Sequence, residues 1–415
     1  MSPSLKEVGR IVGEASPETF LFVSQKEAHP PKYEYVVIRS KELVGETTTD
    51  VEVLAQVVGV ASMSSTYTEN LDYEALQRIY QAGIDDANVI CRARTLGYIM
   101  EEGHKRRILM PRRAIYPGNP VYLAPNDLVE KFFSYPEEEG LHIGYLISRP
   151  KVKVNISLNG FRRHVAIIAQ TGAGKSYTLG VLLEELLGKG ATIVVIDPHA
   201  DYVFLSRDHE GNRIEEYADR VIVFRNPNST GRYSEKDIDN LKPLTFKFAE
   251  LSPDEVADIA GASESYTRIR AAFRNVIEKL REDEKLKDSY GPQDLINKLK
   301  DLSKTSKDKK ANYTGALNYA LNLSKVRVFG DRTTPIEDVL KPFHASILDL
   351  SGLNDASQDY IVYRVLSEIV ELRMRNMFPW PVFIFVEEAH RFVPSRRRTR
   401  SSEIIKTIAA EGRKL

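Results

Sequence analysis

The stretch "HVAIIAQTGAGKSYTLGVLLEELLGKGATIVVID", residues 164–197, decides the fold class of this chain. It opens with a short apolar run, 164–169, and closes with another, 191–197. Between them, the apolar residues of 176–190 recur at helical spacing until a glycine ends the pattern. Two continuously apolar strands joined by a helix are typical of a parallel sheet that is covered on both faces. The stretch therefore predicts an α/β domain.

A second unit of the same kind lies nearer the C-terminal end. It consists of a strand at 345–350, a helix at 357–375 and a strand at 382–386. The apolar residues of its helix also recur at helical spacing, so we expect this helix to pack on the sheet.

The region between the two units is charged and poor in strand-like runs. It opens with Ser252 before an acidic first turn and with Gly261 as a stop, which together predict a capped helix. Amphipathic segments follow. We expect a helical subdomain inserted into the α/β domain.

The N-terminal part of the chain has a different pattern. From about residue 8 to residue 125, short runs rich in β-branched and aromatic residues alternate with turn-formers, and only residues 72–82 look helical. This spacing predicts a small all-β barrel, which we favour over a sandwich. We therefore expect a β-barrel at 1–148, an α/β core at 149–249 and 341–415, and a helical insertion at 250–340.

Composition limits the functions that the chain can have. The 58 Lys and Arg balance 58 Asp and Glu, so a polyanionic partner would have to be met by local basic patches. The single Cys91 excludes an internal disulfide framework and a multi-cysteine zinc site. No apolar run approaches the roughly 18 to 20 residues of a membrane span, and residues 1–10 lack the apolar stretch of a secretory signal. We expect a cytoplasmic protein with no membrane partner.

The most specific motif is "AQTGAGKS", residues 169–176, a phosphate-binding loop in which Ala169 replaces the usual first glycine. Gly172 and Gly174 would let backbone N–H groups approach a phosphate chain, and the helix that begins at Lys175 would direct its positive end at the same oxygens. The Lys175 ammonium would bind the β- and γ-phosphates, and the Ser176 hydroxyl would bind Mg²⁺. The alternative is a plain glycine turn between a strand and a helix. The predicted nucleotide-binding residues are Thr171, Gly172, Ala173, Gly174, Lys175, Ser176, Tyr177 and Asp197.

A phosphate loop also needs an acid from a neighbouring strand to hold the metal. Of the expected strand ends, those at Asp197 and Asp349 carry one acid each, whereas "VFIFVEE" ends in Glu387 and Glu388. ATP hydrolysis uses such a pair, because one carboxylate orients the metal ion and the other activates the attacking water. The alternative is an acidic first turn of a helix.

The other polar residues near these strand ends are less specific. Asp197 and Asp201 follow a strand that would line the ligand crevice, although an ordinary turn is as good an interpretation. We expect His199 and His390 to have structural or supporting roles and Asp349 to serve packing and capping. The guanine-reading sequence Asn-Lys-x-Asp is absent, which favours adenine and therefore ATP.

Several motifs in order resemble the HerA family of hexameric DNA translocases, relatives of the FtsK pumps. They are "VGRIVGEAS" at 8–16, "GYLI" at 144–147, "FRRHVAIIAQTGAGKS" at 161–176, "VIDPHADY" at 195–202, "VEEAHRF" at 386–392 and "IAAEGRK" at 408–414. The resemblance implies a RecA-like core and an ATP- and Mg²⁺-dependent translocase. It also implies a hexameric ring around double-stranded DNA and a NurA-type nuclease as partner in DNA end resection and recombinational repair.

The same resemblance implies roles for individual residues. Glu387 becomes the metal-side acid, together with Ser176, and Glu388 becomes the catalytic base. Arg163 matches an arginine that reaches the nucleotide of its own subunit, and Arg413 matches an arginine finger pointed into the neighbouring site. Without the resemblance, either arginine would be read as a solvated charge or a surface ion pair.

The family pattern continues beyond the sequence given. A further strand, ending in a glutamine that senses the γ-phosphate, follows the "EGRK" helix in the family, whereas this sequence stops at Leu415. For the chain as written we expect weakened or absent hydrolysis, poorer ring stability, and an exposed sheet edge or apolar face around residues 382–386. The alternative functions are a conjugation- or secretion-type ATPase and a nucleotide-binding module without turnover. Two basic clusters, 394–402 and 304–313, are candidates for DNA contact or simply solvated loops.

Overall fold

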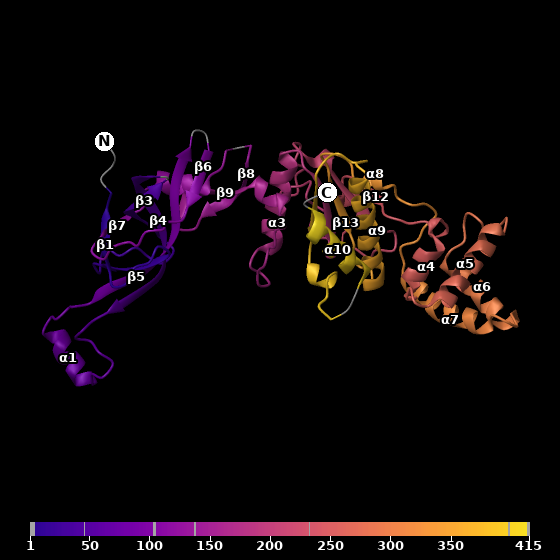
Figure 1. Cartoon of the computed structure of the whole chain (residues 1–415), viewed down its shortest axis with the longest axis horizontal. Coiled ribbons are helices and arrows are strands. Elements are labelled where there is room, and N and C mark those ends of the chain that lie inside the picture. Colours follow the sequence, from indigo (N-terminus) through magenta and orange to yellow (C-terminus); the bar gives the residue numbers. More distant parts are fainter. Residues whose placement is uncertain are drawn as a thin grey trace. The chain divides into compact units, whose positions relative to one another are not determined.

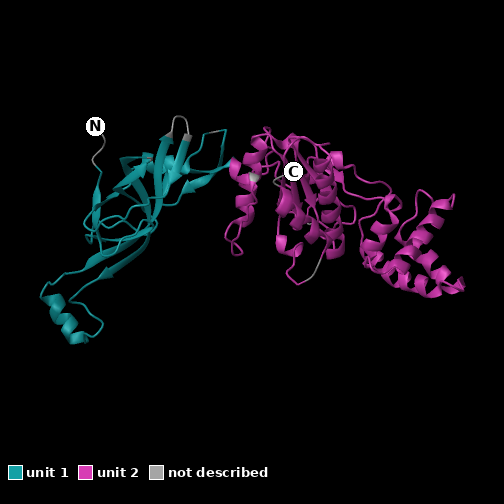
Figure 2. Cartoon of the chain, viewed as in Figure 1, with its two compact units in different colours: residues 1–158 teal, residues 159–415 magenta. Residues whose placement is uncertain are grey.

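The computed structural model describes residues 5–44, 46–102, 105–136, 138–231, 233–396 and 399–412. The chain divides into two compact units, residues 1–158 and 159–415, which Figure 2 colours separately. The first unit extends beyond the expected domain limit at residue 148, because that position falls in the turn of a hairpin. The hairpin strands are β8 (Gly140–Leu146) and β9 (Arg149–Ser157), which pair antiparallel within the first unit.

The first unit is built on a closed six-stranded barrel, as predicted. Its strands are β1 (Glu7–Val12), β2 (Thr19–Ser24), β3 (Tyr35–Val44), β4 (Thr47–Met63), β5 (Asn88–Glu102) and β7 (Pro120–Leu123). They run in the order β2-β1-β7-β3-β4-β5, and β5 pairs back with β2 to close the ring, while β6 (Lys105–Leu109) extends from β5. Alternate side chains point inward, so that β2 buries Phe20 and Phe22 in the barrel core. Closure removes the open edges that a sandwich would leave.

Two helices complete the first unit. α1 (Tyr73–Gln81) lies in the connection between β4 and β5, where its N-terminus is capped by Asp72. α2 (Asn126–Phe133) packs its buried Val129 and Phe132 against a second cluster that contains Tyr35 of β3. The helix predicted at 72–82 is therefore present.

The second unit contains a five-stranded parallel sheet, which confirms the predicted α/β class. Its strands are β10 (Thr192–Asp197), β11 (Val221–Arg225), β12 (Leu241–Pro243), β13 (Ala345–Asp349) and β14 (Val382–Val386), in the order β12-β11-β13-β10-β14. Every residue of β10 and β13 is buried. Because β10 pairs in register with β13 and with β14, the residues that end these three strands lie at the same edge of the sheet.

Three helices flank this sheet. α3 (Lys175–Gly188) follows the phosphate loop, α9 (Asp355–Met374) buries the apolar face predicted for 357–375, and α10 (Arg400–Glu411) packs beside α9 (Figure 1). The short α8 (Ile336–Val339) precedes β13. The described residues also include the 3-10 helices η1 (Leu158–Arg162), η2 (Ala218–Arg220), η3 (Glu235–Asp237), η4 (Phe248–Glu250), η5 (Leu321–Lys325) and η6 (Ala389–Arg391).

Between β12 and η5, where the insertion was expected, the chain forms four α-helices. They are α4 (Pro253–Ala260), α5 (Thr267–Glu282), α6 (Pro292–Thr305) and α7 (Lys310–Ala320). Ser252 forms a capping box with Glu255, and Gly261 ends α4 at a φ of +88°. Buried residues of these helices, among them Phe273, belong to the same apolar core as the sheet.

The strand predicted at 164–169 is absent, which corrects the sequence-based expectation. These residues form no strand among the described parts of the chain, and Val165 and Ile168 are 53% and 91% exposed. An apolar run becomes a buried strand only where it finds a hydrogen-bonding neighbour and covering layers. In the described sheet β14 pairs only with β10, so the expected exposed edge is present beside residues 382–386. No helix in the described ranges is long and apolar enough to cross a membrane.

Candidate nucleotide-binding site

The phosphate loop has the backbone geometry that its glycines predict. Gly172 and Gly174 adopt φ values of +79° and +89°, a left-handed conformation that L side chains rarely adopt. Gly174 is the N-cap of α3 and has no side chain that could cap the helix. The first turn of α3 can therefore present backbone N–H groups and its positive end to an anion.

Lys175 joins the loop to the two adjacent glutamates. Its Nζ lies 2.8 Å from Oε1 of Glu387 and 2.5 Å from Oε1 of Glu388. Hydrogen bonds to the two carboxylates, Glu387 first, raise the pKa of Lys175, and the bond from Lys175 lowers the pKa of Glu388. The predicted phosphate-binding cation and the predicted acid pair thus meet in one charged cluster at the carboxyl end of β14.

The two glutamates have different surroundings. Glu387 is buried, and its backbone N–H donates to the backbone carbonyl of Ile196 in the neighbouring β10 at 3.1 Å. Glu388 adopts a left-handed conformation with φ of +49°, uncommon for a residue other than glycine, and its Oε2 lies 3.1 Å from Nδ1 of His390. Only the three-residue η6 follows. The pair therefore ends a strand and does not open an α-helix.

The turn after β10 brings a second set of side chains to the same place. Buried Asp197 accepts hydrogen bonds from the N–H groups of His199, Asp201 and Tyr202. Burial raises the pKa of Asp197 to about 6, against the opposing effect of these bonds. The turn so formed places Asp201 Oδ2 3.2 Å from the Ser176 hydroxyl oxygen.

Tyr202 is a site residue that the sequence analysis missed. Its hydroxyl donates to Oε2 of Glu387 at 3.1 Å, and its ring is buried. The sequence "IDPHADY" contained a hint of this role. An aspartate at the end of a strand can accept hydrogen bonds from the N–H groups of the following turn, and this fixes the direction of the side chains in that turn. What the sequence alone could not indicate was that this turn faces the end of β14.

Several predicted site residues lie outside this cluster. Thr171, Ala173 and Tyr177 are exposed around the loop, with Tyr177 at 80%. Arg163 is an exposed residue after η1, and Arg413 lies outside the described residues. The structure therefore brings together Lys175, Ser176, Glu387, Glu388 and Asp197 with Asp201 and Tyr202.

Two other expectations concern charged residues away from the loop. Asp349 is buried at the end of β13, accepts from the N–H of Ser351 at 2.9 Å, and is bonded by the Tyr233 hydroxyl. The basic cluster 394–402 falls partly outside the described residues. Within it, the Arg400 side chain donates to the backbone carbonyl of Asp258, so this arginine is engaged inside the molecule.

The oxygen atoms of Ser176 and Glu387 are of the kind that could bind a magnesium ion together with a nucleotide. In the described ranges, no group of three or more His, Cys, Asp or Glu side chains could hold a metal alone. Mg²⁺ characteristically uses one or two protein ligands and completes its shell with phosphate oxygens and water. The Ser176 hydroxyl and the Glu387 carboxylate could serve as such ligands, since both lie near the N-terminus of α3, beside or bonded to Lys175.

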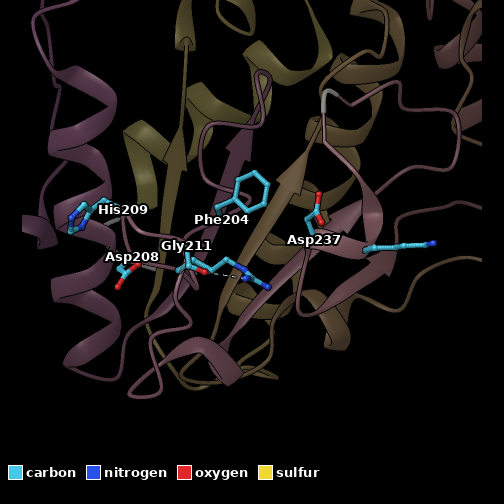
Figure 3. A pocket seen from close by; sticks show the side chains of 7 residues that line it. Phe204, Asp208, His209, Gly211 and Asp237 are labelled. Atoms are coloured by element: carbon cyan, nitrogen blue, oxygen red, sulfur yellow. Dashed lines mark hydrogen bonds between the residues drawn. The ribbon is translucent and has the colours of Figure 1, made fainter.

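A surface hollow of about 370 Å³ lies elsewhere in the second unit. Figure 3 shows its lining, in which Arg207 donates to the carbonyl of Gly211 near Phe204 and Asp237. It contains none of the residues predicted for nucleotide binding, and we assign it no role.

The chain is similar in sequence to known proteins. The model of the family "Helicase HerA, central domain" matches residues 141–369. A protein of Methanocaldococcus jannaschii described as a probable helicase is 26% identical over 98% of this chain and 75% of its own length. The DNA double-strand break repair helicase HerA of Pyrococcus furiosus is 26% identical over 98% of this chain and 77% of its own length. The solved structure of VirB4 from Thermoanaerobacter pseudethanolicus covers 66% of this chain and 74% of that chain, with 14% identity and a TM-score of 0.40. Because the family model matches more than half of the residues, the chain belongs to the HerA helicase family.

Proposed function

We propose that this protein is an ATP-hydrolysing DNA translocase or helicase that acts in the repair of DNA ends. The observation that carries the proposal is the position of Lys175 between Glu387 and Glu388, at 2.8 and 2.5 Å. ATP hydrolysis on a phosphate loop uses such a lysine for the phosphates, one acid for the metal ion and another residue for the attacking water. Relatives described as DNA double-strand break repair helicases support the choice of DNA as the substrate of the motor.

The residues of this chain would divide the work in four parts. Lys175 would leave the glutamates and bind the phosphates, while the first turn of α3 donates N–H groups to the same oxygens. Ser176 and Glu387 would hold Mg²⁺, which neutralises charge on the phosphates when it is bound. Glu388, released by Lys175, would orient the attacking water and accept its proton. Arg163 from the same subunit and Arg413 from a neighbour would stabilise the charge that develops on the transferred phosphate.

The assembly and partners are part of the proposal. An arginine supplied by a neighbour makes hydrolysis depend on subunit contact, which suits a hexameric ring around double-stranded DNA. Phosphate contacts without sequence preference would hold the DNA. The family resemblance supports a NurA-type nuclease as partner and the cytoplasm as location.

A nucleotide-binding module without turnover is the second candidate. The exposed segment 164–169 favours it, because the phosphate loop then lacks the buried strand that would hold it rigidly against the sheet. A loop that is not held in place can bind a nucleotide but cannot preorganise the transition state.

The deciding experiment measures the ATPase rate with and without linear duplex DNA, together with the molar mass in solution. We expect DNA-stimulated hydrolysis by a ring-sized assembly, and we expect Lys175→Ala to abolish it. Lys189→Ala is the matched control, since Lys189 follows the other end of α3. Nucleotide binding without hydrolysis would favour the module, and wild-type rates in Lys175→Ala would contradict both candidates.

A further inference from the structure

We propose that Tyr202 is a positioning residue for Glu387: its hydroxyl holds one carboxylate oxygen in place while the other exchanges the Lys175 ammonium for the metal ion. This inference rests on the proposed nucleotide function.

The two oxygens of Glu387 have different partners. Oε1 is 2.8 Å from Nζ of Lys175, and Oε2 accepts a hydrogen bond of 3.1 Å from the Tyr202 hydroxyl. Glu387 and Tyr202 are each only 4% exposed. The carboxylate is thus a buried anion with one cationic partner, which lies on the nucleotide loop, and one neutral partner, which lies on the turn after β10.

Binding of a nucleotide must change the partner of Oε1. When Lys175 turns to the phosphates, Glu387 loses its counter-charge, and a buried anion without a partner is costly. Glu387 would then hold the divalent cation that accompanies the phosphates through the oxygen that Lys175 has left. The hydrogen bond at Oε2 keeps the carboxylate from rotating during the exchange, so that its free oxygen faces the incoming ion.

The tyrosine is suited to this task because it is itself fixed. Its N–H donates to Oδ2 of Asp197 at 2.9 Å, and Asp197 ends β10, the strand that pairs in register with β14. The same turn holds Asp201, which accepts from the Ser176 hydroxyl. One turn therefore contacts both side chains assigned to the metal, Ser176 and Glu387.

The test is a titration with fluorescent ADP in Mg²⁺ and in EDTA, for the wild type, Tyr202→Phe and Glu387→Gln. The phenylalanine keeps the ring and removes only the hydroxyl. We expect Tyr202→Phe to reduce the Mg²⁺-dependent gain in affinity by about 10-fold. This is the lower end of the roughly 10- to 100-fold loss in metal affinity that follows removal of a side chain that hydrogen-bonds a metal ligand. Its affinity in EDTA should stay within about twofold of the wild type, since the hydroxyl bonds the side chains of Glu387 and Ser176 and not the loop backbone that would bind the phosphates.

Two controls separate positioning from general packing. Tyr217 is another buried tyrosine whose hydroxyl bonds a carboxylate, that of Glu184 on α3, so Tyr217→Phe should leave the Mg²⁺ dependence unchanged. Adding Tyr202→Phe to Glu387→Gln should cause no further loss, because the tyrosine acts through Glu387. A thermal melt shows whether Tyr202→Phe is folded, and an equal loss of its affinity in Mg²⁺ and in EDTA would overturn the positioning role.

The outcomes are distinguishable. A wild type that does not bind ADP would refute the proposed function, and this inference with it. A wild type with Mg²⁺-dependent binding that is lost in Glu387→Gln and retained in Tyr202→Phe would refute the role of Tyr202 alone.

Discussion

Two regions of the second unit carry similar apolar sequences but differ in burial. The interior strands β10 and β13 have every residue buried, whereas β14 at the edge is only partly buried and the apolar run 164–169 is exposed. The difference lies in hydrogen-bonding neighbours, because each interior strand has two and the described β14 has one. The charged nucleotide cluster is at the edge. Rigidity in this unit therefore comes from the interior strands, and the chemistry we propose is at the less constrained side.

The largest expected effect comes from a comparison of two acids: Glu388, which follows the edge strand β14, and Asp349, which ends the interior strand β13. Glu388→Gln should reduce the turnover number by about 10²- to 10⁴-fold, the range for a lost general base, with little change in thermal stability. Asp349→Asn should instead lower thermal stability, since this buried acid is bonded to Tyr233 and to the N–H of Ser351. Steady-state ATPase rates and thermal melts of both variants provide the measurement.

The opposite pattern would break the comparison. If Asp349→Asn loses turnover without losing stability, the interior strand end takes part in the chemistry. Unchanged turnover in Glu388→Gln would remove that residue as the base.

The next prediction concerns the apolar side chains themselves. Ile347→Ala in β13 should lower the free energy of unfolding by about 2 to 5 kcal/mol, because its side chain is completely buried and leaves a cavity. Ile168→Ala, at 91% exposure, should change it by less than about 0.5 kcal/mol. Urea unfolding of the two variants gives both numbers. An equal loss in Ile168→Ala would mean that the run 164–169 is buried in solution, for example by another strand or another copy.

A smaller effect is expected on nucleotide affinity without metal. In the structure Lys175 is engaged by two carboxylates, and a nucleotide must break both contacts. Glu387→Gln should therefore bind ADP more tightly than the wild type in EDTA, by several-fold, since a charged hydrogen bond is replaced by a weaker one. In Mg²⁺ the same variant should bind more weakly. Titration in both conditions checks the change of sign, and a loss in both would show that Glu387 acts on the nucleotide by another route.

The sequence was most informative where local pattern and tertiary environment agree. The glycine loop, the helix cap at Ser252 and the strands β10 and β13 could be predicted because spacing and turn chemistry act over a few residues. The run 164–169 could not be placed, since its apolar pattern matches that of β10 and only the neighbouring strand decides its burial. Tyr202 was missed for a related reason. Its partner Glu387 is 185 residues away, and the contact exists only because β10 and β14 are adjacent.

The smallest expected effect is the pH dependence of stability that comes from Asp197. Its pKa in the folded chain is about 6, above the ordinary 3.8, because burial penalises the charged form. The folded state therefore binds more protons than the unfolded state between these two values, so this group increases stability as the pH falls through 6. The Tm of the wild type minus that of Asp197→Asn should accordingly rise between pH 7.5 and pH 5, by a few degrees. Val195→Ala, which perturbs the same interior strand without removing a titrating group, should lower Tm equally at both pH values. If the Asp197→Asn difference is also independent of pH, the three N–H bonds to Asp197 outweigh its burial, and the acid is ionised throughout.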